Sequence, residues 1–288
     1  MHYKARIKLF VINLLLYNNG MNSIEKEMLN LLVDLRENHC AIGVKAEFEE
    51  EGASYSETAL LKELADLAEL DLTIKIGGCK AIKELFEAKK IGANSIVAPM
   101  IETLYSVKSY IEAVKSVFNP LELKITKFFI NIETITGYAN IDEILNLPEA
   151  AVLSGIVFGR GDFVKSAGLT KDDVNSDKIL AIANDLARKT SALNKEFIIG
   201  GSVSTRSLVF FRNVQKSLLN KVETRKVIFD ARLLNSQNAE EAILKAIQFE
   251  LLWIQNKREN LGIINEIDAK RIIALENCRN KSAEIINC

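Results

Sequence analysis

Apolar and polar residues alternate along the chain in blocks that predict strands and helices in regular succession. Short apolar runs of strand type are each followed by a longer segment in which apolar residues recur with helical spacing. We expect strands at residues 41–48, 72–76, 95–101, 128–132, 155–158, 197–199 and 222–229. We expect helices at residues 23–38, 56–70, 81–90, 104–118, 138–147, 177–193, 204–214 and 238–259. Continuous apolar strands that alternate with amphipathic helices are typical of a parallel sheet covered by helices.

The spacing of the strand ends favours a barrel over an open sheet. The first five strands end at Glu47, Lys75, Glu102, Glu133 and Asp162, and about 30 residues separate each end from the next, the length of one strand–helix unit. Such regular repetition predicts an α/β fold, a (β/α)8 TIM barrel with an extra N-terminal helix and a long C-terminal helix. Seven strands are clear in the pattern, whereas no eighth apolar run is. No nucleotide-binding glycine motif follows a predicted strand, which disfavours nucleotide-binding folds.

The chain is expected to form one barrel domain, residues 21–262, with an extension at each end. Residues 1–20 hold a basic start and an apolar run that is too short to cross a bilayer. We expect them to lie outside the fold, either as an extension upstream of a start at Met21 or as a weak anchor. Residues 263–288 are expected to form a C-terminal accessory helix and tail.

Composition and charge narrow the functional classes. A formal net charge of -1 gives no electrostatic basis for binding nucleic acid or an anionic membrane, so neither partner is expected. Four cysteines without C-x-x-C spacing fit free thiols in a reducing compartment, which predicts a cytoplasmic location. The only histidines are His2 and His39, which disfavours a His-rich metal site. A Ser-His-Asp triad would need His39 as its only imidazole.

The stretch from Phe128 to Gly168 contains the clearest chemical signal. It is predicted as strand, helix and strand, and its two strands end at Glu133 and Asp162. Parallel neighbours bring their carboxyl ends to one rim of a barrel, so we expect the two carboxylates to lie side by side. A divalent cation bound between them would remove their mutual repulsion, so a metal site is one interpretation. The alternative is that both are solvated acids in loops.

The motifs of this stretch resemble the HpcH/HpaI aldolase/citrate lyase family. The family signature is an acid in an "IET" strand end and, about one strand–helix unit later, a "G-P-x-D-L" strand end. The corresponding residues here are Ile132-Glu133-Thr134 and Gly159-Arg160-Gly161-Asp162-Phe163. Residues 96–102 are similar to the preceding strand of the family, and the resemblance covers roughly residues 40–235. It implies a barrel of the phosphoenolpyruvate/pyruvate-binding superfamily.

The resemblance also implies a function, a divalent-metal-dependent carbon–carbon lyase of the class II aldolase type. Such an enzyme acts on a 2-oxo acid through a pyruvate-like enolate, with an aldehyde as the second substrate. Glu133 and Asp162 would hold Mg²⁺ or Mn²⁺, and other divalent ions also accept such hard oxygen ligands. Backbone N–H groups of residues 159–162, with Gly159 and Gly161 among them, would bind the substrate carboxylate.

Two positions depart from the family pattern. Family aldolases carry an arginine where this chain has Lys75, which offers a point charge in place of a bidentate fork. A Schiff-base role for Lys75 is the less favoured alternative. Family aldolases also use a histidine near an early strand end, whereas His39 precedes its strand and is expected at the opposite rim. The predicted general base is therefore Glu47, Glu49 or a metal-bound water.

Further candidates are weaker. Arg160 could bind a second substrate carboxylate or phosphate, or else form a surface salt bridge. Ser202 could line the pocket or serve as a turn residue. Residues 223–225 are expected at the N-terminal rim, which serves stability more than chemistry. The apolar residues 251–253 are expected to form core or to contact a neighbouring subunit, since the resemblance implies a homo-oligomer built through this C-terminal helix.

Two alternative functions stay open at this stage. A citryl- or malyl-CoA-type acyl-CoA lyase would need a basic groove for the phosphates of coenzyme A. Only Lys75, Lys80 and Arg160 supply basic charge near the predicted rim. A non-catalytic barrel that binds a small carboxylate is favoured by the missing histidine and disfavoured by the intact pair of acids.

Overall fold

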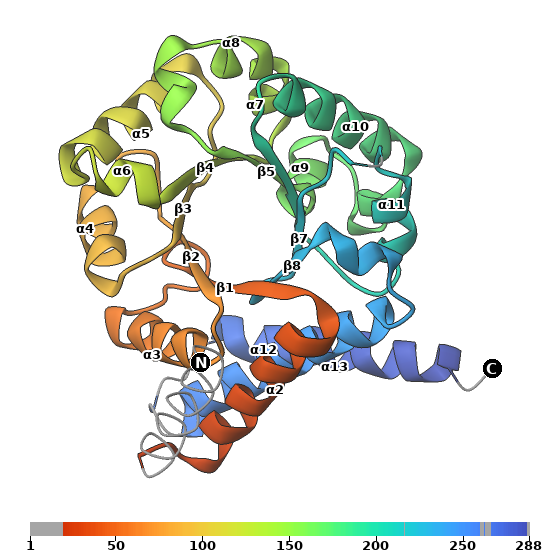
Figure 1. Ribbon diagram of the computed structural model, residues 1–288. Helices are drawn as coiled ribbons and strands as arrows, with labels where there is room; N and C mark the ends of the chain where they lie inside the picture. The colour runs from red at the N-terminus through yellow and green to blue at the C-terminus, as the bar shows by residue number, and fades with distance from the viewer. Residues whose placement is uncertain (1–19, 216, 260–261, 263–265, 287–288) are drawn as a thin grey trace, which may run out of the picture.

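The computed structural model of the protein describes residues 20–215, 217–259, 262 and 266–286. Eight strands follow one another around a closed barrel, and helices form a ring outside it (Figure 1). The strands are β1 (Ala41–Glu47), β2 (Asp71–Lys75), β3 (Ser95–Ala98), β4 (Lys127–Ile132), β5 (Gly155–Gly159), β6 (Glu196–Gly200), β7 (Lys221–Glu223) and β8 (Val227–Asp230). The predicted barrel architecture is therefore confirmed.

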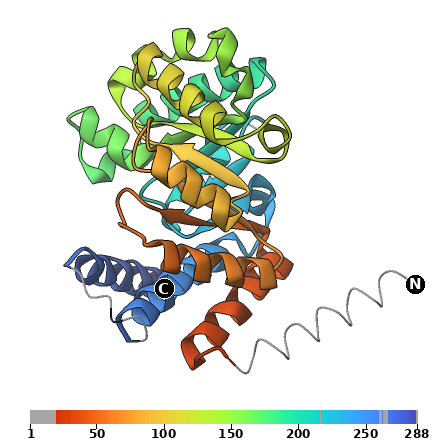
Figure 2. The same cartoon turned by 90° about the vertical axis from the view of Figure 1, so that its left-hand side faces the viewer.

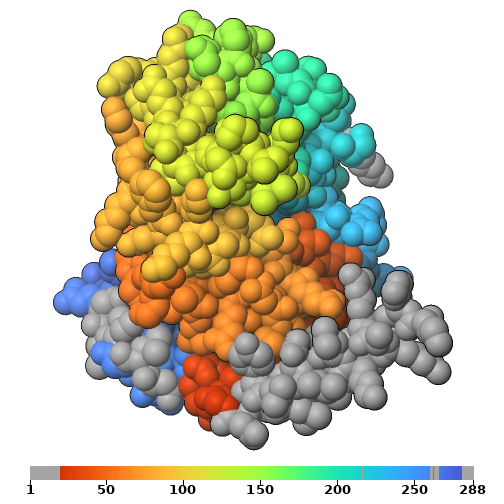
Figure 3. Space-filling model, turned by 60° about the vertical axis from the view of Figure 1, so that its left-hand side comes forward, coloured from red at the N-terminus to blue at the C-terminus, as the bar shows by residue number. Residues whose placement is uncertain are grey.

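The α-helices surround the barrel, and α-helices are also the first and last elements of the described chain. They are α2 (Ser23–His39), α3 (Tyr55–Leu67), α4 (Ile82–Ile91), α5 (Leu104–Val117), α6 (Glu122–Ile125), α7 (Ile135–Ala139), α8 (Ile141–Leu145), α9 (Arg160–Ser166), α10 (Asp177–Ala192), α11 (Ser207–Asn213), α12 (Ala239–Glu259) and α13 (Glu266–Ile286). Short 3₁₀ helices occupy Pro148–Val152, Lys171–Asn175 and Ala231–Asn235. Helices α3 to α5 pack into one continuous face in the space-filling view (Figure 3).

The barrel closes through a reversed strand, which the sequence pattern did not reveal. Strands β1 to β7 are parallel, whereas β8 runs antiparallel to both β7 and β1. The single strand expected at 222–229 is in fact two strands joined by a tight turn. In that turn the Thr224 N–H donates to the Val227 carbonyl, and the Val227 N–H donates to the Thr224 hydroxyl oxygen.

This turn lies at the C-terminal rim of the barrel. The Lys45 N–H donates to the Lys226 carbonyl at 2.9 Å, close to the end of β1. Residues 223–225 therefore lie on the rim where barrel enzymes place their chemistry, and their predicted position at the N-terminal rim is wrong. The reversal of the chain within these few residues is the reason for the error.

Two apolar layers hold the barrel together and leave its mouth polar. The larger core lies between strands and helices, and it includes Val44 and Ala46 of β1. The smaller cluster fills the barrel interior and consists of Val97, Phe129, Val157 and Ile198. Because side chains alternate along a strand, the neighbours of the outward-facing residues point into the barrel. Towards the C-terminal rim those inward-facing positions are charged, as in Lys45 and Glu47.

The two ends of the described chain pack together below the barrel. Helix α12 lies against α2, and α13 lies against α12 (Figures 1 and 2). Ion pairs between Arg271 and Glu250 and between Lys257 and Asp268 join α13 to α12. Trp253 is buried within this chain, so the apolar character of α12 serves the core of one subunit. Assembly into a homo-oligomer stays a prediction.

Within the described ranges, no helix combines the length and the apolar character that crossing a membrane requires. Residues 1–19 lie outside these ranges, so the two interpretations of the N-terminal extension stay predictions.

Candidate active site

The carboxyl ends of β1, β2, β4 and β5 bring the predicted acids and Lys75 to one rim. Glu47 ends β1, Lys75 ends β2, Glu133 follows β4, and Asp162 lies in the first turn of α9 directly after β5. Glu47, Lys75 and Glu133 are almost fully buried, whereas the side chain of Asp162 is 35% exposed. The rim thus combines buried charges with one acid that water and ligands reach.

Glu133 is held in place by donors on both carboxylate oxygens. Its Oε1 accepts from the Met100 N–H at 2.9 Å, and its Oε2 accepts from Asn131 Nδ2 at 2.8 Å. The Lys75 ammonium group lies 3.6 Å from Oε2. Met100 has a φ of 49°, a strained left-handed conformation that is often found at functional sites. Since each carboxylate oxygen has two lone pairs, Glu133 keeps free lone pairs for a further partner.

Glu133 and Asp162 are close enough to influence each other electrostatically. Burial raises the pKa of the Glu133 carboxyl, and the charge of Asp162 adds to this rise, against the opposing effects of Lys75 and the two hydrogen-bond donors. Asp162 forms an ion pair with Lys165 at 2.8 Å. Two interacting carboxylates with hard oxygen atoms fit a divalent cation such as Mg²⁺ or Mn²⁺. Among the described residues no group of three or more His, Cys, Asp and Glu side chains could hold a metal ion.

Gly159 leaves the space that the Glu133 carboxylate occupies. A Cβ atom at position 159 would lie 2.7 Å from Glu133 Oε2, closer than real contacts allow. Gly201 has a φ of 77°, and a Cβ there would lie 2.5 Å from the Gly161 nitrogen. The loop after β6 therefore packs against the start of α9, which also places Ser202 beside Gly161.

Replacing Gly159 by alanine is expected to displace the Glu133 carboxylate and to weaken divalent cation binding by about tenfold or more. Titration with Mn²⁺ followed by electron paramagnetic resonance measures this affinity without any substrate. Gly78→Ala is the matched control, because no atom lies within 4 Å of a Cβ at that position of the same rim. Equal Mn²⁺ affinities in the two variants would contradict the assignment of Glu133.

A second ion network lies beside the first and includes residues that sequence reasoning missed. Lys45 contacts Glu47 Oε1 at 2.9 Å and Glu223 Oε1 at 2.8 Å. Burial disfavours the Glu47 charge, but Lys45 and Lys75 outweigh this effect and lower the pKa of Glu47 to about 2. Glu47 Oε2 and Asn131 Oδ1 are buried and have no hydrogen-bond partner among the residues that the structure describes, so they are available to a ligand or water.

Lys75 is firmly protonated in this environment. Its ammonium group contacts Glu49 at 2.8 Å and Glu133 at 3.6 Å. Burial alone would lower the pKa of Lys75, but the charges of Glu133 and Glu47 and the hydrogen bond to Glu49 raise it overall. A Schiff-base lysine must lose its proton to attack a carbonyl, so these contacts argue against that role.

Arg160 is fully buried and holds loops together. Its guanidinium group donates to the carbonyls of Gly200, Gly201 and Val174 and to the side-chain oxygen of Asn175. It also lies over the rings of Phe210 and Phe211, at 4.6 and 4.7 Å. Burial lowers the pKa of this group. These contacts occupy four of the five guanidinium N–H groups of a fully buried side chain, so Arg160 does not fit the predicted role of a substrate ligand or that of a surface salt bridge.

Replacing Arg160 by lysine is expected to lower the free energy of unfolding by about 1–3 kcal/mol, because several buried carbonyls lose their donor. Urea denaturation measures this change. Arg188→Lys, at an exposed ion pair on α10, is the control and should have little effect. A variant of normal stability with a raised KM for substrate would instead support the ligand role.

His39 lies at the opposite end of the barrel, as predicted. It is the last residue of α2, directly before β1 begins, and its Nε2 lies 2.9 Å from Lys245 Nζ. Cys40 and Cys79 are free thiols.

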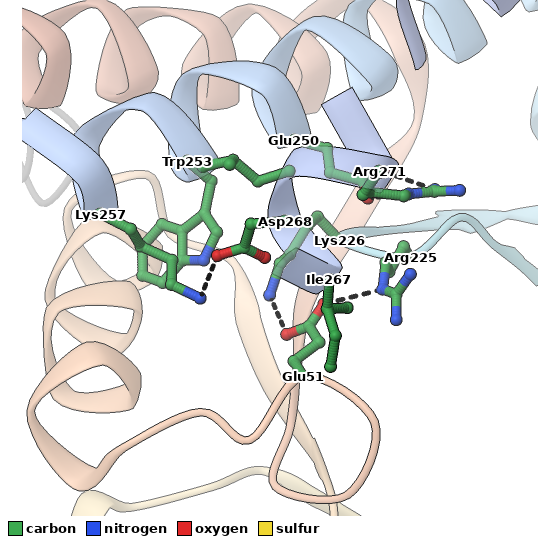
Figure 4. Close-up of a pocket in the computed structure, with 10 residues that line it drawn as sticks. Glu51, Arg225, Lys226, Glu250, Trp253, Lys257, Ile267, Asp268 and Arg271 are labelled. Carbon is green, nitrogen blue, oxygen red and sulfur yellow. Dashed lines mark hydrogen bonds and ion pairs between the residues drawn. The ribbon is translucent and has the colours of Figure 1, made fainter. Parts of the chain in front are cut away.

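A charged pocket lies between the β7–β8 turn, α12 and α13 (Figure 4). Glu51 forms ion pairs with Arg225 and Lys226, and Lys226 also lies over the ring of Trp253. The space inside holds about one water molecule. Its acidic and basic groups pair with one another, so we assign it to support of the rim turn that carries Glu223.

The fold and the site together define a TIM-type barrel with its acids and lysines gathered at the C-terminal rim. A family model described as HpcH/HpaI aldolase/citrate lyase matches residues 68–197, the segment that contains β2 to β5. This match, over less than half of the chain, confirms the resemblance inferred from the motifs. Among curated proteins, no relative matches the chain.

Solved structures share the fold at low sequence identity. An HpcH/HpaI aldolase from Desulfitobacterium hafniense DCB-2 is 13% identical with a TM-score of 0.54, over 77% of this chain and 88% of that chain. An HpcH/HpaI aldolase/citrate lyase family protein from Burkholderia cenocepacia J2315 is 12% identical with a TM-score of 0.56, over 78% and 90%. The citrate synthase SbnG is 18% identical with a TM-score of 0.51, over 60% and 72%.

Proposed function

We propose that the protein is a divalent-metal-dependent carbon–carbon lyase of the class II aldolase type. Its substrates are a 2-oxo acid, which reacts through a pyruvate-like enolate, and an aldehyde. The observation that carries the proposal is the pair of carboxylates, on Glu133 and Asp162, that directly follow the adjacent parallel strands β4 and β5 at the C-terminal rim. The match to the HpcH/HpaI family supports it.

The charge of the barrel mouth also supports a cation site. Two buried ammonium groups, on Lys45 and Lys75, face four carboxylates, on Glu47, Glu49, Glu133 and Glu223. With Asp162 and its partner Lys165 included, five carboxylates face three ammonium groups, and this excess of two negative charges equals the charge of one divalent cation. When bound at Glu133 and Asp162, Mg²⁺ or Mn²⁺ would polarise the keto oxygen and stabilise the enolate.

The chain's own groups fill the other roles. Lys75, with its proton retained, supplies positive charge beside Glu133, where the family pattern has an arginine. We assign the proton transfer to Glu49, which contacts Lys75 and whose side chain is 28% exposed. Glu47 fits the base role less well, because an acid with a pKa of about 2 attracts a proton weakly at neutral pH. Glu47 and Lys45 instead fix the charge around the site. Backbone N–H groups at Gly159 to Asp162 are the candidates for binding the substrate carboxylate.

Deuterium exchange into the methyl group of pyruvate, followed by proton NMR, tests the proposal before any aldehyde is known. We expect exchange with Mg²⁺ or Mn²⁺ and none with a chelator. Absence of exchange despite bound metal would contradict the proposal and direct attention to acyl-CoA substrates or to a binding role. We further propose a cytoplasmic homo-oligomer, and analytical ultracentrifugation would test its assembly.

A further inference from the structure

Both buried ammonium groups in the barrel mouth already have two carboxylate partners. Lys45 lies 2.9 Å from Glu47 and 2.8 Å from Glu223. Lys75 lies 2.8 Å from Glu49 and 3.6 Å from Glu133. The positive charge of each lysine is therefore already balanced by carboxylates of the protein.

Three other cations around the mouth also have partners within the protein. Lys165 pairs with Asp162, and Arg225 pairs with Glu50 and Glu51. Arg160 is enclosed by carbonyl groups and aromatic rings. Lys80 and Arg206 are exposed on the loops after β2 and β6, where water and salt screen their charges.

The balance of charge in the barrel mouth then limits the charge that the second substrate, the aldehyde, can carry. One divalent cation neutralises the excess of two carboxylates, and the pyruvate carboxylate makes the mouth negative again. A carboxylate or phosphate on the aldehyde would add a second negative charge, and the described part of the chain offers no free buried cation to balance it. Like charges brought together beside buried charged groups repel each other and weaken binding, so the mouth favours partners without charge.

We propose that the aldehyde partner of this enzyme is uncharged, and that the barrel mouth discriminates against carboxylated and phosphorylated aldehydes. This inference rests on the proposed function. In the addition, a proton leaves the pyruvate methyl carbon, and the electron pair of that carbon forms the bond to the aldehyde carbon. The aldehyde oxygen takes up a proton, so the step needs no oxidant or reductant.

Matched aldehydes test the inference on the full-length protein with pyruvate and Mn²⁺. Butyraldehyde is compared with succinic semialdehyde, which carries a carboxylate on a chain of the same length, and glyceraldehyde with its phosphate. We expect kcat/KM to favour the neutral member of each pair by about tenfold or more. The ratio should shrink as salt is added. It should also shrink in Glu223→Gln, which removes one carboxylate from the network.

The possible outcomes separate this inference from the proposed function. If pyruvate exchanges deuterium but the charged aldehyde reacts better, the proposed function survives and this inference is wrong. If such a preference for the charged aldehyde disappears in Arg206→Ala, exposed rim cations set the selectivity, which also overturns the inference. If pyruvate does not exchange at all, both fail.

Discussion

Replacing Glu133 by glutamine is expected to reduce metal-dependent deuterium exchange into pyruvate by about 10²–10³-fold or more, while the fold is retained. The substitution keeps the shape of the side chain but removes one of the two carboxylates that the proposal assigns to the cation. Mn²⁺ binding, followed by electron paramagnetic resonance, should weaken in parallel. This second readout distinguishes a lost cation site from a defect in chemistry alone.

Glu102→Gln is the matched control for this substitution. Glu102 also follows a strand of the same rim, and it is partly exposed, but it forms no ion pair among the described contacts. Its replacement should leave Mn²⁺ binding and exchange within about twofold of the wild type. Full exchange in Glu133→Gln, or an equal loss in Glu102→Gln, would remove Glu133 from the proposed site.

The parallel part of the barrel could be predicted from the sequence because the pattern of apolar residues there matches the burial of those residues in the folded protein. Strands such as β4 are buried on both faces, so their sequences are nearly continuous apolar runs, and capped amphipathic helices separate them. The Ser54 and Glu57 capping box at the start of α3 is an example of such a local signal. The β7–β8 turn has no glycine, proline or asparagine, and the two flanking strands are short. Its geometry depends on the hydrogen bonds between Thr224 and Val227, and a pattern of apolar residues cannot predict these bonds.

The candidate site was predictable only where its residues lie at strand ends. The rule that parallel strands share a rim places Glu133 and Asp162 together. Lys45 and Glu223, in contrast, meet across the reversed strand β8, so their ion pair requires the topology to be known. The role of Arg160 depends on two phenylalanines of α11, far along the chain, and its neighbour Asp162 gives no hint of that contact.

Replacing Lys45 by methionine is expected to lower the free energy of unfolding by about 3–5 kcal/mol at neutral pH. The substitution keeps the apolar stem but leaves Glu47 and Glu223 as buried carboxylates without their ammonium partner. Urea denaturation measures the loss. The matched variant Lys45→Met/Glu47→Gln/Glu223→Gln removes all three charges and should recover much of it. If the triple variant is no more stable than Lys45→Met, loss of packing rather than unpaired charge is the cause.

The pH dependence of this loss provides an independent check. In the wild type, Lys45 and Lys75 hold the pKa of Glu47 at about 2, below its ordinary value of 4.5. A lowered carboxyl pKa stabilises the fold above the unfolded pKa, and this contribution disappears as the pH falls from about 4.5 to about 2. Without Lys45, burial acts with less opposition and raises the pKa of Glu47 above its wild-type value, so ionisation at neutral pH costs more. The difference in unfolding free energy between wild type and Lys45→Met should therefore be largest near pH 7 and should narrow towards pH 3. A difference that stays constant over this range would mean that the Glu47 charge does not contribute to the stability of the barrel mouth.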